Sequence, residues 1–234
     1  MEELREPRNY FSILRAIAQG RTRLNEITQA AGVGDVNTAA RYLDILQQMR
    51  LVTRRVPATE PQPEKSKKGL YQIEDHFLRF WFRYVHPNQS SLDLGLADAV
   101  LTQRVQPDLD HFAAAAFEEA AVTFTGRLAQ AGQLDFLPER IGGWWHRKAE
   151  MDVLAVNLTE KTALVGECKW SIHPVGTRVL DELKQKAQIF QQEHGIENIQ
   201  YAVFARRGFT PELEEAAKAE GVRLFTVESL INPS

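Results

Sequence analysis

The feature that most constrains the fold is a pair of short apolar segments, residues 152–156 and 163–170, joined by the polar turn 157–161. Their length and composition predict two adjoining strands. Alternation along the second strand defines two faces. One face carries Ala163, Val165, Glu167 and Lys169, and the other carries Leu164, Gly166, Cys168 and Trp170. An acid and a lysine two residues apart on an apolar strand are atypical of a core, so the pattern predicts a polar site.

The chemistry of these side chains favours a metal site. Asp152 and Glu167 would supply hard carboxylate oxygens for Mg²⁺ or Mn²⁺, and one or two carboxylates with a phosphate oxygen suffice for such an ion. Lys169 would orient or help deprotonate a water, or stabilise charge in the transition state. Glu118, on a preceding helix, would reach the same site from the side. The structural alternative is an ion pair between Lys169 and either carboxylate.

The front of the chain has the order of a winged helix-turn-helix. Apolar spacing predicts helices over 8–20 and 24–32 and a third that begins at Asp35 or Asn37. A strand (51–56), a Pro- and Lys-rich loop (57–68) and a second strand (69–73) follow. The sequence of residues 75–85 predicts a helix with aromatic side chains on most of its sides. We therefore expect this helix to be buried. Residues 87–91 are the predicted linker, so the expected domains are 1–90 and 91–234.

The back half alternates helices and strands in a way that predicts a mixed sheet. A long helix over about 109–130 precedes three strands, the first through Trp144, Trp145 and His146. A helix (177–193), a strand (201–205), a helix (211–219) and a last strand (222–226) complete the order. We therefore expect an α/β protein whose sheet is flanked by helices on both faces.

The predicted DNA contacts lie in the front domain. Residues 1–90 carry a net charge of +4 and the remainder −7. Basic side chains grip phosphates, and Asn, Gln or Arg reads base edges. The candidates lie on the third helix, the first strand and the loop: Asn37, Thr38, Arg41, Arg54, Arg55, Lys65, Lys67 and Lys68. The alternative is a domain of the same fold used for protein packing.

Two resemblances extend this interpretation. Phe117-Glu118, Glu150-Met151-Asp152 and Glu167-Cys168-Lys169 resemble the motifs of PD-(D/E)xK nucleases, although no Pro precedes Asp152. This resemblance implies a restriction-endonuclease-like fold, metal binding by Asp152 and Glu167, hydrolysis assisted by Lys169, and Glu118 as an auxiliary ligand. It also implies an extra polar group on the following helix, from Lys184, Gln185 or Lys186.

The second resemblance covers nearly the whole chain. Arg8-Asn9-Tyr10-Phe11, Phe77-Leu78-Arg79-Phe80-Trp81-Phe82 and the stretch from Asp152 to Lys169 resemble the post-ATPase region of archaeal and bacterial DEXX-box ATPases. It implies a P-loop ATPase domain or subunit as a partner. The chain contains no G-x-x-x-x-G-K-[ST] motif, so no ATP site is expected within it.

The cysteine, the histidines and the apolar segments limit the kinds of site and the cellular location that we expect. The single cysteine, Cys168, excludes an internal disulfide framework and is expected to be a buried apolar residue. The six histidines lack zinc-ligand spacing. Neither a signal peptide nor a membrane span is evident, so we expect a cytoplasmic protein, with self-association left open.

The leading functional prediction is Mg²⁺- or Mn²⁺-dependent hydrolysis of DNA with help from the winged helix. The competing prediction is a non-catalytic DNA-binding, regulatory or assembly module of an ATPase on an inactive nuclease fold. The choice between DNA and RNA, and between endonuclease and exonuclease action, is left open.

Overall fold

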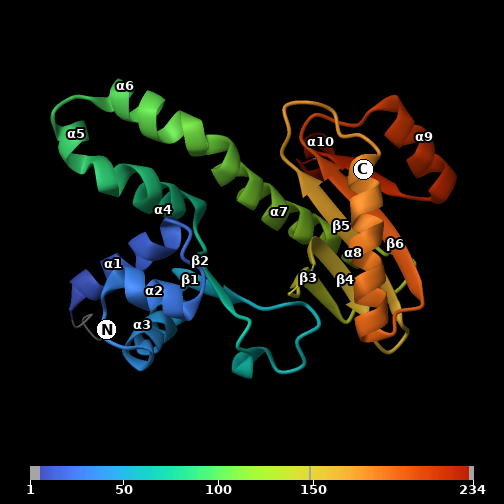
Figure 1. The fold of residues 1–234 in the computed structure, drawn as a ribbon, viewed down its shortest axis with the longest axis horizontal. Coiled ribbons are helices and arrows are strands. Elements are labelled where there is room, and N and C mark those ends of the chain that lie inside the picture. Colours follow the sequence, from blue (N-terminus) through green and yellow to red (C-terminus); the bar gives the residue numbers. More distant parts are fainter. Residues whose placement is uncertain (1–5, 148, 232–234) are drawn as a thin grey trace. The chain divides into compact units, whose positions relative to one another are not determined.

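The computed structural model describes residues 6–147 and 149–231, which form two units (Figure 1). The first comprises 6–56 and 62–109, and the second 57–61, 110–147 and 149–231. The expected α/β class is confirmed. The elements in chain order are α1 (Pro7–Ala18), α2 (Leu24–Ala31), α3 (Val36–Gln48), β1 (Val52–Arg55), β2 (Leu70–Ile73), α4 (His76–Phe80), α5 (Gln89–Asp93), α6 (Ala97–Val100), α7 (Gln106–Gln130), β3 (Arg140–Trp145), β4 (Glu150–Asn157), β5 (Thr162–Lys169), α8 (Arg178–His194), β6 (Asn198–Ala205), α9 (Pro211–Glu220), β7 (Arg223–Thr226) and α10 (Val227–Ile231).

The first unit packs three helices against a small antiparallel sheet of β1 and β2, in which Val52 pairs with Ile73. Asp35 caps α3, because its Oδ1 accepts the N–H of Thr38 at 2.8 Å. Gly32 ends α2 with a φ of 64°, a conformation that glycine adopts without strain. The apolar faces of these elements share one core. Its fully buried members include Ile13, Ile27, Leu43 and Ile73.

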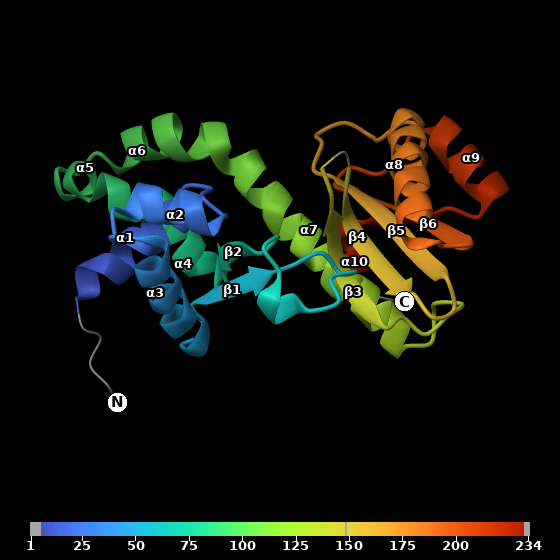
Figure 2. The same ribbon diagram turned by 60° about the horizontal axis from the view of Figure 1, so that its bottom comes forward.

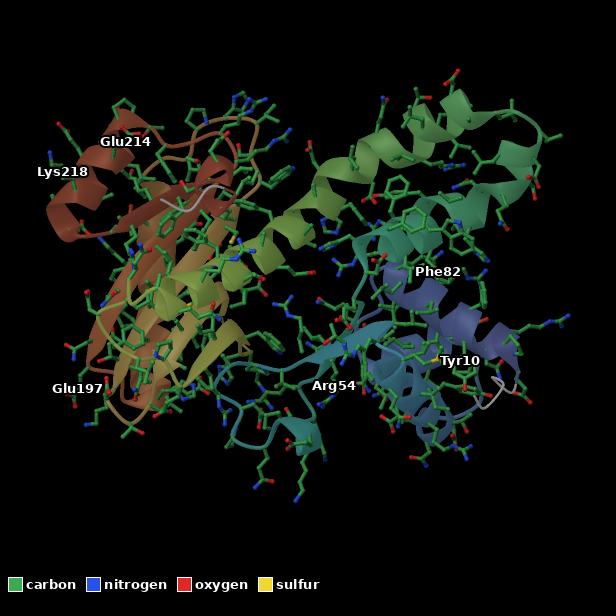
Figure 3. The ribbon with its side chains drawn as sticks, turned by 180° about the vertical axis from the view of Figure 1, so that it is seen from behind. Tyr10, Arg54, Phe82, Glu197, Glu214 and Lys218 are labelled. Atoms are coloured by element: carbon green, nitrogen blue, oxygen red, sulfur yellow. The ribbon has the colours of Figure 1, made fainter. Side chains whose placement is uncertain are left out.

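The aromatic helix is buried or half-buried along most of its length, and its first turn is exposed. α4 continues as a π-helical turn over Trp81–Val85. Phe82 is buried in the same core as Tyr10 (Figure 3), whereas the side chain of Phe77 is 71% exposed. The expectation of buried aromatic residues is therefore confirmed for Phe82 and Tyr84 and wrong for Phe77, which lies in the exposed first turn of the helix.

The predicted linker over 87–91 is helical. A 3₁₀ turn (His86–Asn88) leads into α5, and Pro87 is tolerated there because the first turn of a helix needs no N–H donor from it. Nε of Arg83 and the hydroxyl of Tyr84 both lie 2.6 Å from Oδ2 of Asp108. These contacts keep residues up to 109 with the first unit, so the division falls at 109/110 rather than at the predicted 90/91.

The second unit is a five-stranded sheet in the order β3-β4-β5-β6-β7. The pairs β3–β4 and β4–β5 are antiparallel, and β5–β6 and β6–β7 are parallel. α7 packs on one face and α8 on the other, as Figure 2 shows. Leu164 and Cys168 lie on the α7 side, and Ala163 and Val165 lie on the α8 side. The predicted alternation along this strand is confirmed.

A segment from far upstream covers the outer edge of this sheet. Residues 57–61 belong to the second unit although they lie between β1 and β2 in the sequence. The N–H of Ala58 donates to the carbonyl of Gly143 at 2.9 Å, and the guanidinium of Arg140 donates to the carbonyl of Glu60. These contacts give β3 hydrogen-bond partners on the side away from β4.

Gly166 allows the strands around the polar site to pack closely. A Cβ built there would lie 3.0 Å from both the Phe204 ring and Cβ of Val153. We expect Gly166→Ala to lower the free energy of unfolding by about 1–3 kcal/mol through overpacking, as measured by urea denaturation. Gly126→Ala in α7 is the control, since a Cβ there meets nothing within 4 Å. This control should be neutral or stabilising by up to about 1 kcal/mol, and equal effects of the two variants would contradict the packing argument.

Candidate active site

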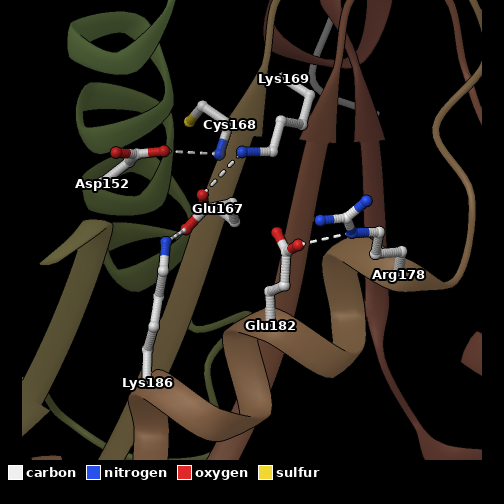
Figure 4. A network of polar contacts seen from close by, with 7 residues as sticks. All are labelled: Asp152, Glu167, Cys168, Lys169, Arg178, Glu182 and Lys186. Carbon is white, nitrogen blue, oxygen red and sulfur yellow. Dashed lines mark hydrogen bonds and ion pairs between the residues drawn. The ribbon is translucent and has the colours of Figure 1, made fainter. Parts of the chain in front are cut away.

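An irregularity in β4 sets the position of Asp152. Gly142 pairs with Leu154 and Trp144 pairs with Met151, so two steps along β3 oppose three along β4. The extra residue forms a β-bulge in the stretch that contains Asp152, and bulges commonly redirect a side chain beside a site. Oδ2 of Asp152 accepts the backbone N–H of Cys168 at 2.8 Å (Figure 4). The bulge and this hydrogen bond fix the carboxylate beside the end of β5.

Glu167 lies between two lysines. Its side chain is 8% exposed, with Oε1 2.8 Å from Nζ of Lys169 and Oε2 2.7 Å from Nζ of Lys186 (Figure 4). Of the three polar candidates on α8, Lys186 is therefore the one that reaches the site. Lys184 pairs with Glu220, and Gln185 is exposed. The predicted ion pair of Lys169 with a carboxylate is present alongside the predicted carboxylate pair.

The two carboxylates interact electrostatically. Burial and the charge of Glu167 raise the pKa of Asp152 to about 6, against the opposing effects of the Cys168 N–H and the two lysines. Burial alone would lower the pKa of Lys169, but the hydrogen bond and charge of Glu167, with a contribution from Asp152, raise it. Lys169 is thus an ammonium at neutral pH, suited to stabilising negative charge.

Cys168 is the buried apolar residue that the sequence predicts. It is 9% exposed within the apolar cluster on the α7 side of the sheet. Burial, with further contributions from nearby carboxylates including Glu118, raises the pKa of its thiol. The thiol therefore stays protonated and is a poor nucleophile.

The donor set fits a hard divalent cation that keeps most of its waters. Asp152 and Glu167 supply two carboxylates, and Mg²⁺ commonly binds one or two of these together with substrate phosphate oxygens. Within residues 6–147 and 149–231, no group of three or more His, Cys, Asp or Glu side chains is arranged to hold a metal ion. Glu118 is near enough to influence Cys168, and its role as a third ligand stays a prediction.

The predicted DNA-binding residues of the first unit fall into two groups, one exposed to solvent and one engaged in internal hydrogen bonds. Asn37, Arg41, Lys65, Lys67 and Lys68 are exposed, and Thr38 is half-buried at the start of α3. The guanidinium of Arg54 instead donates to the carbonyls of Pro63, at 2.7 Å, and Ser66. Arg55 donates to Oε1 of Gln72 at 3.3 Å.

Arg54 therefore organises the loop between the two strands. A Cβ at position 69 would clash with the guanidinium of Arg54, so Gly69 leaves room for this arrangement. Neither partner carbonyl is identifiable from the sequence, because both belong to an irregular loop.

Sequence reasoning missed a second polar group at the end of β5. Trp170, Arg206 and Asp110 contact one another there. The one sequence signal was that Trp170 directly follows Lys169. Nδ1 of His146 lies 3.6 Å from Oε2 of Glu193. Trp144 is 2% exposed and belongs to the core on the α8 side of the sheet.

The hydropathy of the helices gives one further finding. None of the helices formed by the described residues is both long and apolar enough to cross a membrane.

One comparison with known proteins, that with a family model, covers the stretch that holds this site. Residues 81–186 match a family (DUF234) described as archaea bacterial proteins of unknown function. That stretch contains Glu118, Asp152, Glu167, Lys169 and Lys186. The chain is thus similar to an archaeal and bacterial family, and the resemblance to the post-ATPase region of DEXX-box ATPases stays a prediction.

A longer relative matches more of the chain. The uncharacterized protein MJECL04 of Methanocaldococcus jannaschii is 38% identical over 168 residues, which is 72% of this chain and 37% of that protein. The chain thus spans little more than a third of the relative's length. A solved O-methyltransferase, NcsB1 from neocarzinostatin biosynthesis, is 15% identical with a TM-score of 0.25, covering 97% of this chain and 65% of the enzyme. This overlap is too low to indicate a shared fold.

Proposed function

We propose that the second unit is a restriction-endonuclease-like domain that hydrolyses DNA phosphodiester bonds with Mg²⁺ or Mn²⁺. The observation that carries the proposal is the convergence of Asp152 and Glu167 from adjacent strands, with Lys169 on Glu167. An ordinary core does not bring two carboxylates together, because each burial costs free energy and their charges repel. Functional sites accept such a cost.

Each residue has a role in this proposal. Asp152 and Glu167 would hold the cation, with Glu118 as an auxiliary ligand, and the bound cation would supply an activated water and charge neutralisation. Metal binding by Glu167 requires at least one of its two lysine contacts to lengthen. Lys169 would then be free to orient the attacking water or to stabilise charge on the phosphorus oxygens.

The first unit would act as a winged helix-turn-helix that holds DNA. Three helices followed by an antiparallel strand pair support this, with α3 as the recognition helix. The exposed Asn37 and Arg41 would approach base edges, and Lys65, Lys67 and Lys68 would contact phosphates. The resemblance to post-ATPase regions further supports a P-loop ATPase domain or subunit as a partner.

One observation favours a non-catalytic alternative. Both oxygens of Glu167 already have ammonium partners, so the cluster is satisfied without a cation. In that case the domain would be a scaffold that serves DNA binding, regulation or assembly of an ATPase.

Metal titration and DNA cleavage separate the two proposals. Mg²⁺ and Mn²⁺ are titrated into the wild-type chain and into Asp152→Asn by calorimetry, and nicking of supercoiled plasmid is followed with each. We expect binding by the wild type and a loss of at least about 100-fold in cleavage rate in the variant, since activation of the water depends on the metal. A wild type that binds neither cation, or cleavage retained by a folded variant, would exclude the metal-dependent nuclease.

A further inference from the structure

The end of the sheet next to the candidate active site carries an ordered arginine. Trp170 directly follows β5 and Arg206 directly follows β6, and these parallel strands pair Lys169 with Ala205. The backbone N–H of Arg206 donates to the carbonyl of Lys169 at 3.1 Å. Trp170 and Arg206 therefore lie side by side at the carboxyl ends of two parallel strands, where open α/β sheets commonly bind ligands.

Two contacts hold the side chain of this arginine in place, and two further contacts hold the tryptophan beside it. The guanidinium carbon of Arg206 lies 4.6 Å from the centre of the Trp170 ring, within the range of a cation–π interaction. Oδ1 of Asp110 accepts from Nε1 of Trp170 at 3.2 Å and from an N–H of Arg206 at 2.9 Å. The ring of Phe117 lies 5.3 Å from that of Trp170 on the α7 side. An ordered guanidinium loses less entropy when it binds an anion.

The arginine is accessible, and its present partner is exchangeable. The Arg206 side chain is 27% exposed, and that of Asp110 is 72% exposed. A surface ion pair of this kind contributes little to stability. A phosphate can therefore replace the carboxylate with small loss, and it matches the planar fork of the guanidinium.

The charge of the second half of the chain makes a local phosphate contact necessary for DNA binding there. Residues 91–234 carry a net charge of −7, which repels a polyanion. The carboxyl ends of β5 and β6 nevertheless bring basic side chains together among these carboxylates, with Lys169 and Arg206 adjacent and Arg207 exposed. Arg178, at the start of α8, is 90% exposed and pairs with Glu182, as Figure 4 shows.

We propose that Arg206 binds a backbone phosphate of DNA beside the phosphodiester presented to Asp152, Glu167 and Lys169. Trp170 is the positioning residue that holds the guanidinium flat, and Asp110 is the counter-anion that the phosphate replaces. This inference rests on the proposed function for its substrate. It assigns the second unit its own contact with DNA, separate from those of the first unit.

Arg206→Gln tests the contact directly. Binding of a short labelled DNA duplex to the full chain is followed by fluorescence anisotropy in EDTA, so that no cleavage occurs. We expect affinity to fall about 5- to 10-fold and the salt dependence to weaken by about one counterion, as for the loss of one phosphate contact. Arg206→Lys should lie between the wild type and Arg206→Gln, because the charge remains and the planar fork is lost.

Arg223→Gln is the matched control. Arg223 lies 5.5 Å over the Phe225 ring and donates to the carbonyl of Gln133 at 2.9 Å, but it begins β7 and so lies away from the carboxyl ends of the strands. We expect its affinity for DNA to equal that of the wild type. Equal weakening by both substitutions would overturn the proposal, since net charge alone would then explain the effect.

Asp110→Asn gives an independent test if Arg206→Gln fails to fold. Removal of the competing anion should strengthen DNA binding about 2- to 5-fold, and unchanged or weaker binding would overturn the proposal. The proposed function can fail separately. A wild type that binds DNA through Arg206 but never cleaves it would remove the nuclease and keep this contact. Cleavage and binding that are both unchanged in folded Arg206→Gln would remove the contact and keep the nuclease.

Discussion

Asp152→Asn is expected to be more stable than the wild-type chain at pH 8, by about 3 kcal/mol in free energy of unfolding. Burial and the nearby charge of Glu167 raise the pKa of Asp152 from 3.8 to about 6. Ionisation is therefore harder in the folded protein than in the unfolded one. Asparagine has no charge to bury, and its side-chain oxygen can still accept the N–H of Cys168.

The sign of the pH dependence follows from the raised pKa. The favourable contribution of protonated Asp152 is fully present below pH 3.8 and is lost as pH rises through about 6. The advantage of the variant should therefore shrink to about half at pH 5 and vanish below pH 4. Urea unfolding of both proteins at pH 8 and pH 5 measures this difference. A variant less stable than the wild type at pH 8 would show that the carboxylate is structural.

Glu167→Gln is expected to act in the opposite direction and to lower the free energy of unfolding by about 2–3 kcal/mol. The buried carboxylate is the shared partner of Lys169 and Lys186. Neutralising it leaves two ammonium groups close together with only Asp152 to compensate. The lysines are 36% and 26% exposed, which keeps the expected loss below that of a fully buried pair. Urea denaturation at pH 7 measures it.

Glu182→Gln is the matched control for this second prediction. Glu182 also lies on the α8 side of the sheet and pairs at 2.8 Å with Arg178, whose side chain is 90% exposed. We expect no measurable change in stability, because solvent screens such a pair. If the two variants lost comparable free energy of unfolding, burial would not strengthen the ion pairs of Glu167.

The two carboxylates thus have different effects on stability. Glu167 compensates two cations, whereas Asp152 adds a charge that the fold would be more stable without. A stability gain on neutralising Asp152 together with a loss of metal binding is typical of a residue retained for function. The same gain without any metal binding would favour the scaffold alternative.

The sequence predicted most of the local structure because local rules decide it. Alternation along β5 follows from its own residues, and the cap at Asp35 follows from spacing within one turn. The interpretation of residues 87–91 as a linker differs from the structure because Pro87 begins a helical turn, a role that proline serves as readily as it serves a break.

The parts that escaped prediction depend on contacts between distant residues. The bulge beside Asp152 exists only relative to the register of β3. The choice of Lys186 over its neighbours depends on the rotation of α8 against the sheet. The group of Asp110, Trp170 and Arg206 joins three segments that the sequence keeps at least 36 residues apart. Periodicity within one segment carries no information about any of these.

The place of segment 57–61 in the sequence affects the order in which the parts of the second unit are synthesised. It is made long before β3, since Ala58 and Gly143 bond across more than 80 residues. The strand that this segment borders cannot exist until the ribosome has produced the long helix between them. A nascent second unit made without it would expose an open strand edge, a template for pairing with another chain. Early translation thus supplies a part that protects the later domain from misassembly.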